Sequence, residues 1–534
     1  MKRNYIYGAC LGLMTLFATG CEDQLDIAKH GNMGGQDDFY TNDTNVGQAV
    51  AAMYNEVLGT EVSVWGMKNY LSDDVHCGGG MRGDNSTSEQ LNEYAFGADH
   101  ATIKGAYSAL YTTIYTANLI IDKTNYDSEV AQRAIAEAHF FRAWAHFELV
   151  SMWGNVPIVD HLLQPSEYRQ SNRKPEEVYA FIISDLEEAV SSNALPSKSS
   201  IDDKNTGVRV TKEAAYALLG KAKLFAGDAA GAAAAFENII GSGLYDLWQG
   251  AYRDLFHISG NNCCESILEC QVPNDPEKSW DFFMTQMGYY TITGWRTGLM
   301  EVDTYNPNMW TYVQGGWGFF NPRKELWDEF VRLEGENGYR KQQIITDYTG
   351  LQAYGLKIQA GQSLVGCEGY WFHKHQTYVS DCSTYPFVGF PTFQAINFRL
   401  MRYAEVLLLA AEANLAAGNS AKATEYLNKV RARAQEPALA SVSLDDIKAE
   451  KRLELCMEGV RYQDLLRWGE GAKYMANQGK QVPSCAHGDG STGNVNPSAF
   501  SNPEAGFKAG KHELLPIPHE EIKLNGNMKQ NPGW

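Results

Sequence analysis

The chain of 534 residues carries a formal net charge of −19 at pH 7, and 44% of its residues are hydrophobic. Such an acidic surface argues against a nucleic-acid backbone or an anionic membrane surface as the binding partner, and it is compatible with neutral ligands such as sugars. The length allows two or three domains, or one continuous body of helical repeats around a large core.

Residues 1–20 have the composition of a lipoprotein signal peptide. Two basic residues precede an apolar stretch at 6–17, and three small residues follow before Cys21. This order predicts export, cleavage before Cys21 and lipidation of that cysteine; an ordinary signal peptide with a chance cysteine is the alternative. Two or more acyl chains hold a protein stably on a membrane. Residues 21–40 are polar and acidic, and they predict a tether.

Residues 41–255 predict an N-terminal helical scaffold. Apolar residues recur at helical spacing in segments predicted to be helices, at 45–58, 101–122, 128–153, 174–192, 211–226 and 229–241. The last two segments predict a helix–turn–helix pair, the kind of unit that stacks in tetratricopeptide-like repeats. Residues 65–99 lack this periodicity, so we expect an irregular segment there.

Residues 256–390 predict a second, loop-rich lobe, because helical periodicity fades while Gly, Pro and aromatic residues become more frequent. Six of the twelve tryptophans of the chain lie in it: Trp280, Trp295, Trp310, Trp317, Trp327 and Trp371. Long loops that carry large aromatic side chains are seldom mere connectors. We therefore expect this lobe to bind the ligand.

Residues 391–534 predict a C-terminal helical segment that packs on the scaffold and ends in a tail with the sequence PIP. A helix is predicted at 399–417 and a second at 420–434, with Gly418 between them in the left-handed conformation and Ser420 as N-cap.

Charged residues in the C-terminal segment predict a polar line on one helix and a capping box at the start of another. Glu405 and Glu412 lie seven residues apart, and we expect them on one polar line of the first helix. A further helix is predicted for 443–468, where Ser443 and Asp446 match a capping box.

The glycine-rich stretch at 78–84 matches two motifs without the context that they need. It fits G-x-G-x-x-G, but neither a strand before it nor a helix after it is predicted, so dinucleotide binding is not supported. Arg82-Gly83-Asp84 spells an adhesion tripeptide, which is common by chance. We interpret the stretch as a flexible loop beside a ligand groove.

Glu450, Glu454 and Glu458 recur one helical turn apart, and paired carboxylates can hydrolyse glycosides when they are held about 5 to 9.5 Å apart. Four charged residues lie among them at helical spacing: Arg452, Arg461, Asp464 and Arg467. An ion-pair network that locks this helix to its neighbours is therefore favoured over catalysis.

Metal and disulfide signals are weak. His373 and His375 alternate near Glu368, but no third ligand has a telling spacing, so no metal is predicted. The cysteines form no C-x-x-C pair. Cys456 is expected in a helical core face, and one or two disulfides within 263–382 are an open alternative. No cofactor is predicted.

Aromatic residues interleaved with short polar ones are typical of sugar sites, because a ring packs on the C–H face of a sugar while polar groups take its hydroxyls. Two stretches fit this pattern, at 65–84 and 288–317. The candidate ligand-binding residues are Trp65, Tyr70, Asp73, Asp74, Tyr289, Tyr290, Trp295, Arg296, Trp310 and Trp317. Core packing is the alternative for any one of them.

Five motifs in fixed order resemble the SusD/RagB family of nutrient-binding outer-membrane lipoproteins. They are EAHFFRAWAHFELVSMWGNVPIV from Glu137, KPEEVYAFIISDLEEAV from Lys174, FRLMRYAEVLLLAAEANLAAG from Phe398, EKRLELCMEGVRYQDLLRWG from Glu450, and LLPIPHEEIKLN from Leu514 with the terminal QNPGW. Lys451 stands where Arg is usual in the family, and Trp534 where Tyr is usual.

The resemblance implies a mainly α, tetratricopeptide-like scaffold with a loop-rich lobe, and a binding protein rather than an enzyme. It also implies a glycan ligand, a lipid anchor at Cys21 facing the cell exterior, and a TonB-dependent outer-membrane barrel that receives the nutrient. A surface glycoside hydrolase and a peptide-binding repeat protein are the alternatives that the sequence leaves open.

Overall fold

A computed structural model describes residues 39–272, 288–302, 315–381, 394–488 and 492–534. The predicted leader and tether, Cys21, Trp310 and the side chain of Tyr289 lie outside the described residues. Within the described ranges, no helix has both the length and the apolar character that crossing a membrane requires.

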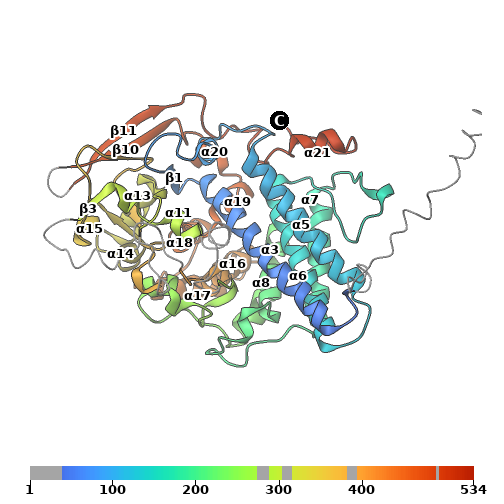
Figure 1. Cartoon of the computed structure of the whole chain (residues 1–534). Coiled ribbons are helices and arrows are strands. Elements are labelled where there is room, and N and C mark those ends of the chain that lie inside the picture. Colours follow the sequence, from blue (N-terminus) through green and yellow to red (C-terminus); the bar gives the residue numbers. More distant parts are fainter. Residues whose placement is uncertain (1–38, 273–287, 303–314, 382–393, 489–491) are drawn as a thin grey trace, which may run out of the picture.

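The described chain is mainly helical, which confirms the predicted fold class (Figure 1). The longer helices are α3 (Asp43–Tyr70), α5 (Ala101–Lys123), α6 (Glu129–Trp153), α7 (Pro175–Ser191), α8 (Lys212–Phe225), α9 (Ala229–Ile240), α13 (Lys324–Glu334), α16 (Tyr403–Ala416), α17 (Ser420–Arg433) and α18 (Leu444–Leu455). The shorter ones are α4 (Ser86–Asn92), α11 (Gly288–Thr293), α14 (Tyr339–Ile344), α15 (Tyr348–Ala353), α19 (Arg461–Arg467), α20 (Gly471–Met475) and α21 (His519–Leu524).

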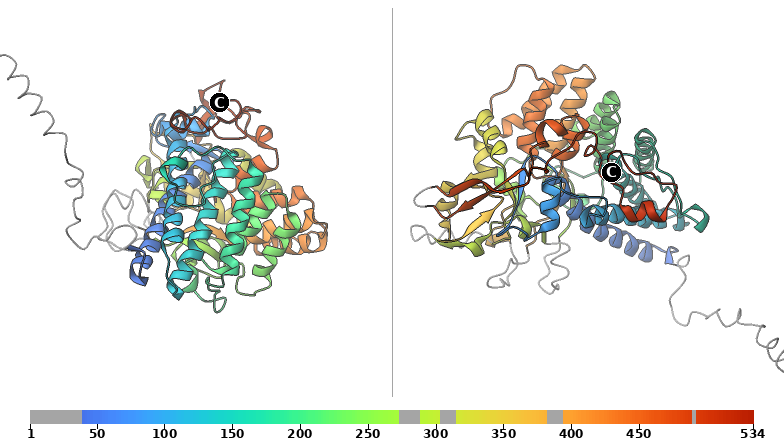
Figure 2. Two further views of the ribbon diagram at one scale, coloured as in Figure 1. Left: turned by 90° about the vertical axis from the view of Figure 1, so that its right-hand side faces the viewer. Right: turned by 90° about the horizontal axis from the view of Figure 1, so that it is seen from above.

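Successive helices pack against each other as hairpins, so the predicted tetratricopeptide-like scaffold is confirmed. Contacts join α5 to α6, α6 to α7, α8 to α9 and α16 to α17, and the long helices lie side by side in the left view of Figure 2. Helix α9 also packs against α16. The α8/α9 and α16/α17 hairpins therefore stack on one another although about 180 residues separate them in sequence.

The α16/α17 hairpin differs in detail from the prediction. Residues 398–402 form strand β9 (Phe398–Arg402) rather than the first turn of a helix. Gly418 has the expected left-handed φ of 84°. The N-cap of α17 is Asn419, whose side chain accepts a hydrogen bond from the amide of Lys422, so Ser420 is the first helical residue. The expected apolar face, including Tyr426 and Leu427, is buried.

Glu405 and Glu412 do not form an exposed polar line. Both are buried between helices, where Glu405 pairs with Lys221 at 2.9 Å and Glu412 pairs with Arg467 at 2.6 Å. These carboxylates join α16 to α8 and to α19, because a buried charge needs a partner on a neighbouring element.

Helix α3 is longer than predicted. It begins after Asn42, whose side chain caps the amide of Asn45, and it continues to Tyr70 rather than ending near residue 58. Its second half is largely buried, so tertiary packing holds a helical segment that contains β-branched residues. Residues 65–70 are therefore not irregular, and α4 interrupts the rest of the expected irregular stretch.

The helix predicted at 443–468 is two helices. Ser443 and Asp446 form the expected capping box at the start of α18. Met457 and Gly459 have positive φ values of 64° and 73°, which separates α18 from α19.

Among the described residues, short strands lie mostly between α9 and α16, with one after α3 and two after α20. The strands are β1 (Val75–Gly78), β2 (Ser266–Cys270), β3 (Met300–Val302), β4 (Phe319–Pro322), β5 (Ile345–Asp347), β6 (Leu356–Ile358), β7 (Ser363–Val365), β8 (Tyr370–Phe372), β9, β10 (Gln481–Ala486) and β11 (Asn494–Ser501). All pairings are antiparallel: β1 with β4, β2 with β9, β3 with β6, β5 with β8, and β10 with both β7 and β11. A small apolar cluster that includes Trp295, Leu351 and Trp371 forms under these strands.

The C-terminal tail packs on the end of α6. The indole of Trp153 donates to the carbonyl of Pro516 at 3.0 Å, and Asn531 donates to the carbonyls of Trp153 and Leu515. The ring of Trp534 stacks on Phe96 with centroids 5.4 Å apart. These contacts hold the C-terminal tail that contains the PIP sequence against the helical scaffold.

Candidate functional site

The two stretches predicted to bind a ligand lie against each other. Strand β1 follows α3 and pairs with β4, which places Gly78 opposite Phe319. The amide of Gly79 donates to the carbonyl of Gly318 at 2.9 Å, and the guanidinium of Arg296 lies 3.0 Å from the carboxylate of Asp84. The two stretches that the sequence singled out are therefore adjacent in the fold.

An open pocket of about 300 Å³ lies where these regions meet, and we call it the junction pocket. Helix α3 contributes Val62 and Ser63, α4 contributes Ser88, and α11 contributes Ile292. Phe320 of β4 lines it too. Apolar walls with a few hydroxyl and amide groups suit a ligand that has apolar faces and polar edges.

Trp65 and Tyr70 line the junction pocket, but they are built into its wall. The side chain of Trp65 is 3% exposed, and its indole donates to the carbonyl of Met457 at 2.9 Å. Tyr70 stacks on Phe320 with ring centroids 3.9 Å apart. Their ring faces are already covered by protein, so we do not retain them as stacking platforms for a sugar.

Asp73 and Asp74 are occupied by arginines from the C-terminal segment. Asp73 accepts two hydrogen bonds from Arg461, at 2.8 and 3.0 Å, and Asp74 accepts one from Arg452 at 2.8 Å. Burial alone raises an aspartate pKa, but Arg452 and Arg461 lower the pKa of Asp73 well below its usual range. Because both carboxylates are buried and paired, the structure corrects the expectation that they bind sugar hydroxyls.

The candidate residues in the 288–317 stretch differ in how far they are buried. Tyr290 and Trp295 are buried, and the indole of Trp295 donates to the carbonyl of Phe372 at 2.8 Å. Trp317 and Arg296 are partly exposed. Arg296 donates to the backbone carbonyl of Trp317 at 3.0 Å. The amide of Trp317 donates to the carbonyl of Thr291 at 2.7 Å, next to the pocket residue Ile292.

The glycine-rich loop is held in place by hydrogen bonds and ion pairs within the chain. Asp84 accepts a hydrogen bond from the amide of Gly80 at 2.7 Å, and Arg82 forms ion pairs with Glu89 and Glu93. The Arg-Gly-Asp tripeptide is therefore engaged in contacts within the chain. Asn85, the N-cap of helix α4, lines the junction pocket, so this loop forms part of its rim.

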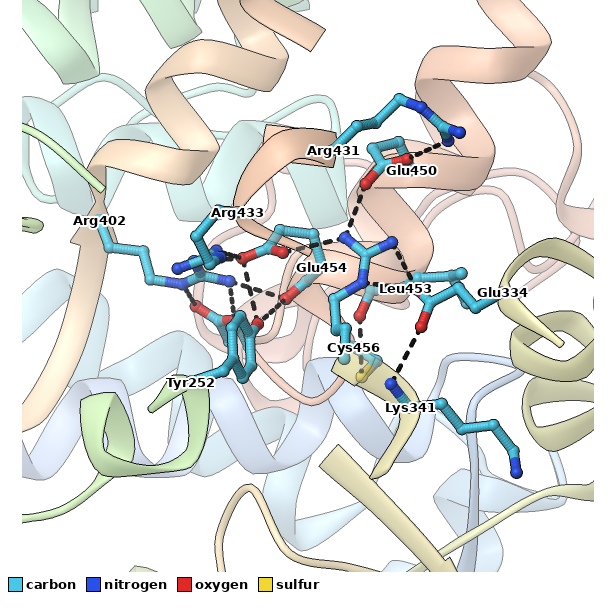
Figure 3. Close-up of polar contacts among 12 residues, drawn as sticks. Tyr252, Glu334, Lys341, Arg402, Arg431, Arg433, Glu450, Leu453, Glu454 and Cys456 are labelled. Atoms are coloured by element: carbon cyan, nitrogen blue, oxygen red, sulfur yellow. Dashed lines mark hydrogen bonds and ion pairs between the residues drawn. The ribbon is translucent and has the colours of Figure 1, made fainter. Parts of the chain in front are cut away.

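Glu450 and Glu454 belong to a buried ion-pair network (Figure 3), and Glu458 joins it through Arg402 at 2.7 Å. Glu454 pairs with Arg402 at 2.6 Å and with Arg340 at 3.0 Å, and it also contacts Arg433. These arginines hold the pKa of Glu454 well below its usual range although burial opposes ionisation. The predicted structural role of these carboxylates fits this geometry: Glu450 and Glu454 are buried, and the partly exposed Glu458 pairs with Arg402 and Lys374.

The histidine pair lies in the same interior. His373 and His375 are buried, and the ring of His373 packs on that of Trp295 with centroids 5.3 Å apart. Among the described residues, no group of three His, Cys, Asp or Glu side chains converges as metal ligands do. The described cysteines are free thiols, and Cys456 is buried as expected.

Some pocket residues were missed by sequence reasoning. Val62 and Ser63 fell between the helix predicted at 45–58 and the irregular segment expected at 65–99, although they lie on the continuation of α3. Ile292 follows the predicted tyrosine pair, and its position two residues after Tyr290 is the signal that would have found it.

Two family models match the chain. One, described as the SusD family, matches residues 365–534, and one described as starch-binding associating with outer membrane matches residues 37–224. Similar proteins include SusD-like protein P2 of Formosa agariphila, 25% identical over 98% of both chains. The starch-binding protein SusD of Bacteroides thetaiotaomicron is 24% identical over 84% of this chain and 82% of its own. A solved laminarin-binding SusD-like protein is 28% identical, covers 93% of this chain and all of its own, and superimposes with a TM-score of 0.76.

Proposed function

Because this chain belongs to the SusD family, we propose that it captures a neutral glycan at the junction pocket and releases it without breaking a bond. The observation that carries the proposal is the meeting of the 65–84 and 288–317 stretches at an open pocket. Arg296 pairs with Asp84, the neighbour of the pocket residue Asn85. Trp317 is hydrogen-bonded to Thr291, the neighbour of the pocket residue Ile292. A partly exposed indole next to a guanidinium can stack on a sugar ring and donate to its hydroxyls.

The relatives support a glycan as the ligand class. Two of the proteins to which the chain is similar are named for binding laminarin and starch, which are neutral polysaccharides. A protein with a net charge of −19 repels anionic polymers but not neutral ones.

Binding without hydrolysis is supported by the state of the carboxylates. Glycosidases need two carboxyl groups facing one open cleft, whereas Glu450, Glu454 and Glu458 are held by buried arginines and Lys374. This arrangement favours capture over the glycoside hydrolase alternative.

The proposal includes a cellular setting. Lipidation at Cys21 would hold the protein on the outer face of the outer membrane, and a TonB-dependent barrel would receive the glycan. One matching family model is described as associating with the outer membrane. Replacing Cys21→Ser should release the protein from cell envelopes, and a barrel should copurify with the lipidated form. Envelope association that survives Cys21→Ser would contradict the anchor.

The test of glycan capture is affinity electrophoresis of the mature chain in gels containing laminarin, starch or other neutral polysaccharides, with a parallel assay for released sugar. Retardation by a polysaccharide without released sugar is the expected result. Trp317→Ala should weaken retardation about five- to tenfold, because the loss of one stacking platform costs on the order of 1–1.5 kcal/mol.

Trp248→Ala is the matched control, since Trp248 is also a partly exposed tryptophan but lies outside both stretches, whereas the amide of Trp317 donates to the carbonyl of Thr291, the neighbour of the pocket residue Ile292. Released sugar would establish the hydrolase alternative. Equal retardation of the Trp317→Ala variant and the wild type would remove the junction pocket from the proposal, and retention of a peptide instead of any glycan would favour the peptide-binding alternative.

A further inference from the structure

A second open pocket, which we call the tyrosine pocket, lies on another face of helix α5. It encloses about 410 Å³. The residues that matter for the argument are Tyr107, Ser108, Tyr111, Tyr115, Tyr168 and Glu521. None of these was a candidate from sequence.

Three segments distant in sequence build the tyrosine pocket. Tyr107, Tyr111 and Tyr115 recur every four residues, so they share one face of α5. The 154–173 segment is fixed over this face because the Tyr111 hydroxyl donates to the carbonyl of Pro157 at 2.9 Å. Helix α21 closes the far side, next to the start of α5 (Figure 1), where Lys104 pairs with Glu520 at 2.6 Å.

The tyrosines become progressively more exposed along the pocket. Tyr107 is 2% exposed at its base, whereas Tyr115 is 52% and Tyr168 is 64% exposed at its rim. A tyrosine stripe that served only the core would not open onto solvent in this way. Large aromatic side chains that surround an open concavity are typical of a binding site.

The tyrosine pocket also holds hydrogen-bonding groups that the described chain leaves unused. The Tyr107 hydroxyl is buried and makes no hydrogen bond of normal geometry to a described residue. Within the same described residues, the Glu521 carboxylate and the Ser108 hydroxyl have no hydrogen-bond or ion-pair partner. A buried hydroxyl without a partner costs free energy, which a ligand with its own hydroxyls would recover.

We propose that the tyrosine pocket binds one end or one unit of a neutral oligosaccharide, as a second glycan site of this chain. The ring of Tyr168, which is 64% exposed, offers a face for the C–H side of a sugar, and Glu521 accepts from its hydroxyls. The carboxylates of Glu520 and Glu521 disfavour an anionic ligand. The inference shares its ligand class with the proposed function, but it does not require the junction pocket to be occupied.

Both pockets are attached to one rigid helix. Thr102 of α5 lines the junction pocket, and Ser108 lines the tyrosine pocket. Six residues of an α-helix span about 9 Å along the axis. A single polysaccharide chain that reaches both pockets would be held more tightly than by either alone, because the second contact is intramolecular.

Ligand binding at the two pockets can be measured separately by hydrogen–deuterium exchange. The mature chain is measured with and without laminarihexaose or maltohexaose. Slower exchange in 154–173 and 519–528 reports the tyrosine pocket, and slower exchange in 59–67 and 288–299 reports the junction pocket. We expect protection of both. The double variant Tyr168→Ala, Glu521→Gln should lose protection at the tyrosine pocket and bind polysaccharide about tenfold more weakly in affinity gels.

Tyr474→Ala is the control, because Tyr474 is an exposed tyrosine that lines neither pocket. Protection of the junction pocket alone would overturn the inference and leave the proposed function standing. Protection of the tyrosine pocket alone would support the inference and remove the junction pocket from the proposed function. Protection of neither pocket would overturn the inference and favour a protein partner for the tyrosine pocket.

Discussion

Glu61 of α3 is a buried acid whose charge is incompletely balanced. Its carboxylate lies 3.8 Å from the ammonium of Lys68, but Lys68 already pairs with Glu148 at 3.1 Å. Burial raises the pKa of Glu61 from 4.5 to about 7, and the charge of Glu148 adds to the rise while Lys68 opposes it. The folded protein therefore binds a proton at Glu61 more tightly than the unfolded chain does.

Stability linked to Glu61 is present below pH 4.5 and is lost as the pH rises through about 7. Glu61→Gln removes this loss, so it should raise the free energy of unfolding at pH 8 by on the order of 1–3 kcal/mol, at about 1.4 kcal/mol for each unit of pKa shift. Below pH 4.5 the variant and the wild type should unfold alike.

Urea unfolding at pH 4 and pH 8 measures the Glu61→Gln effect. Glu504→Gln is the control, because Glu504 has 91% of its side chain exposed and should change stability at neither pH. A Glu61→Gln effect of equal size at both pH values would show that titration of this carboxylate is not its cause.

Most helices were predictable because their apolar periodicity is local. Helices α5, α6 and α7 begin and end within one or two residues of the expected positions. Strand β9 was missed because Phe398–Arg402 reads as a helix start, whereas its pairing with β2 depends on residues more than 100 positions earlier. Val62, Val64 and Gly66 weaken the local helical signal of α3, and only burial in the assembled core restores it.

The candidate site was predictable as a region but not residue by residue. Aromatic residues mixed with polar ones identified both stretches that form the junction pocket. The same pattern gave no means of knowing that Arg461 would occupy Asp73, since the two are 388 positions apart. Likewise, Trp295 is buried whereas Trp317 is partly exposed, and the residues around them in the sequence do not predict this difference.

The β1–β4 pair joins the two halves of the junction pocket, and at Gly78 the opposite backbone leaves no room for a side chain. Gly78 has a φ of 80°, and a Cβ there would lie 2.4 Å from the carbonyl oxygen of Gly318. Gly78→Ala should therefore destabilise the protein through both backbone strain and a clash, and it should weaken glycan binding by displacing β4.

Gly83→Ala is the matched control for Gly78→Ala. Gly83 also has a positive φ, of 92°, but its Cβ would meet nothing within 4 Å. Strain alone costs about 1–2 kcal/mol, so chemical unfolding should show Gly78→Ala to be the more costly change by about 1 kcal/mol or more. Equal costs would mean that β4 moves away from β1 without penalty.

At the scale of the whole molecule, the buried ion-pair network joins the loop-rich region to the helical scaffold. Arg340 of α14 pairs with Glu450 and Glu454 of α18. Arg402 of β9 pairs with Glu454 and Glu458 at 2.6 and 2.7 Å. Each carboxylate must stay ionised for these contacts, so the connection between the two parts depends on pH.

Acid should therefore unfold the molecule through this network. Burial opposes ionisation of Glu458, but Arg402 and Lys374 lower its pKa from 4.5 to about 2, and the pKa of Glu454 is lowered further. A depressed carboxylate pKa gives stability that is present above pH 4.5 and is lost as the pH falls toward 2. We expect the free energy of unfolding to fall steeply within that window.

Glu458→Gln should lower the free energy of unfolding at pH 7 by about 3–5 kcal/mol, because it leaves a buried arginine and lysine underpaired. The same variant should show a weaker dependence of stability on acid pH. An acid dependence as steep in Glu458→Gln as in the wild type would assign the acid lability to other carboxylates.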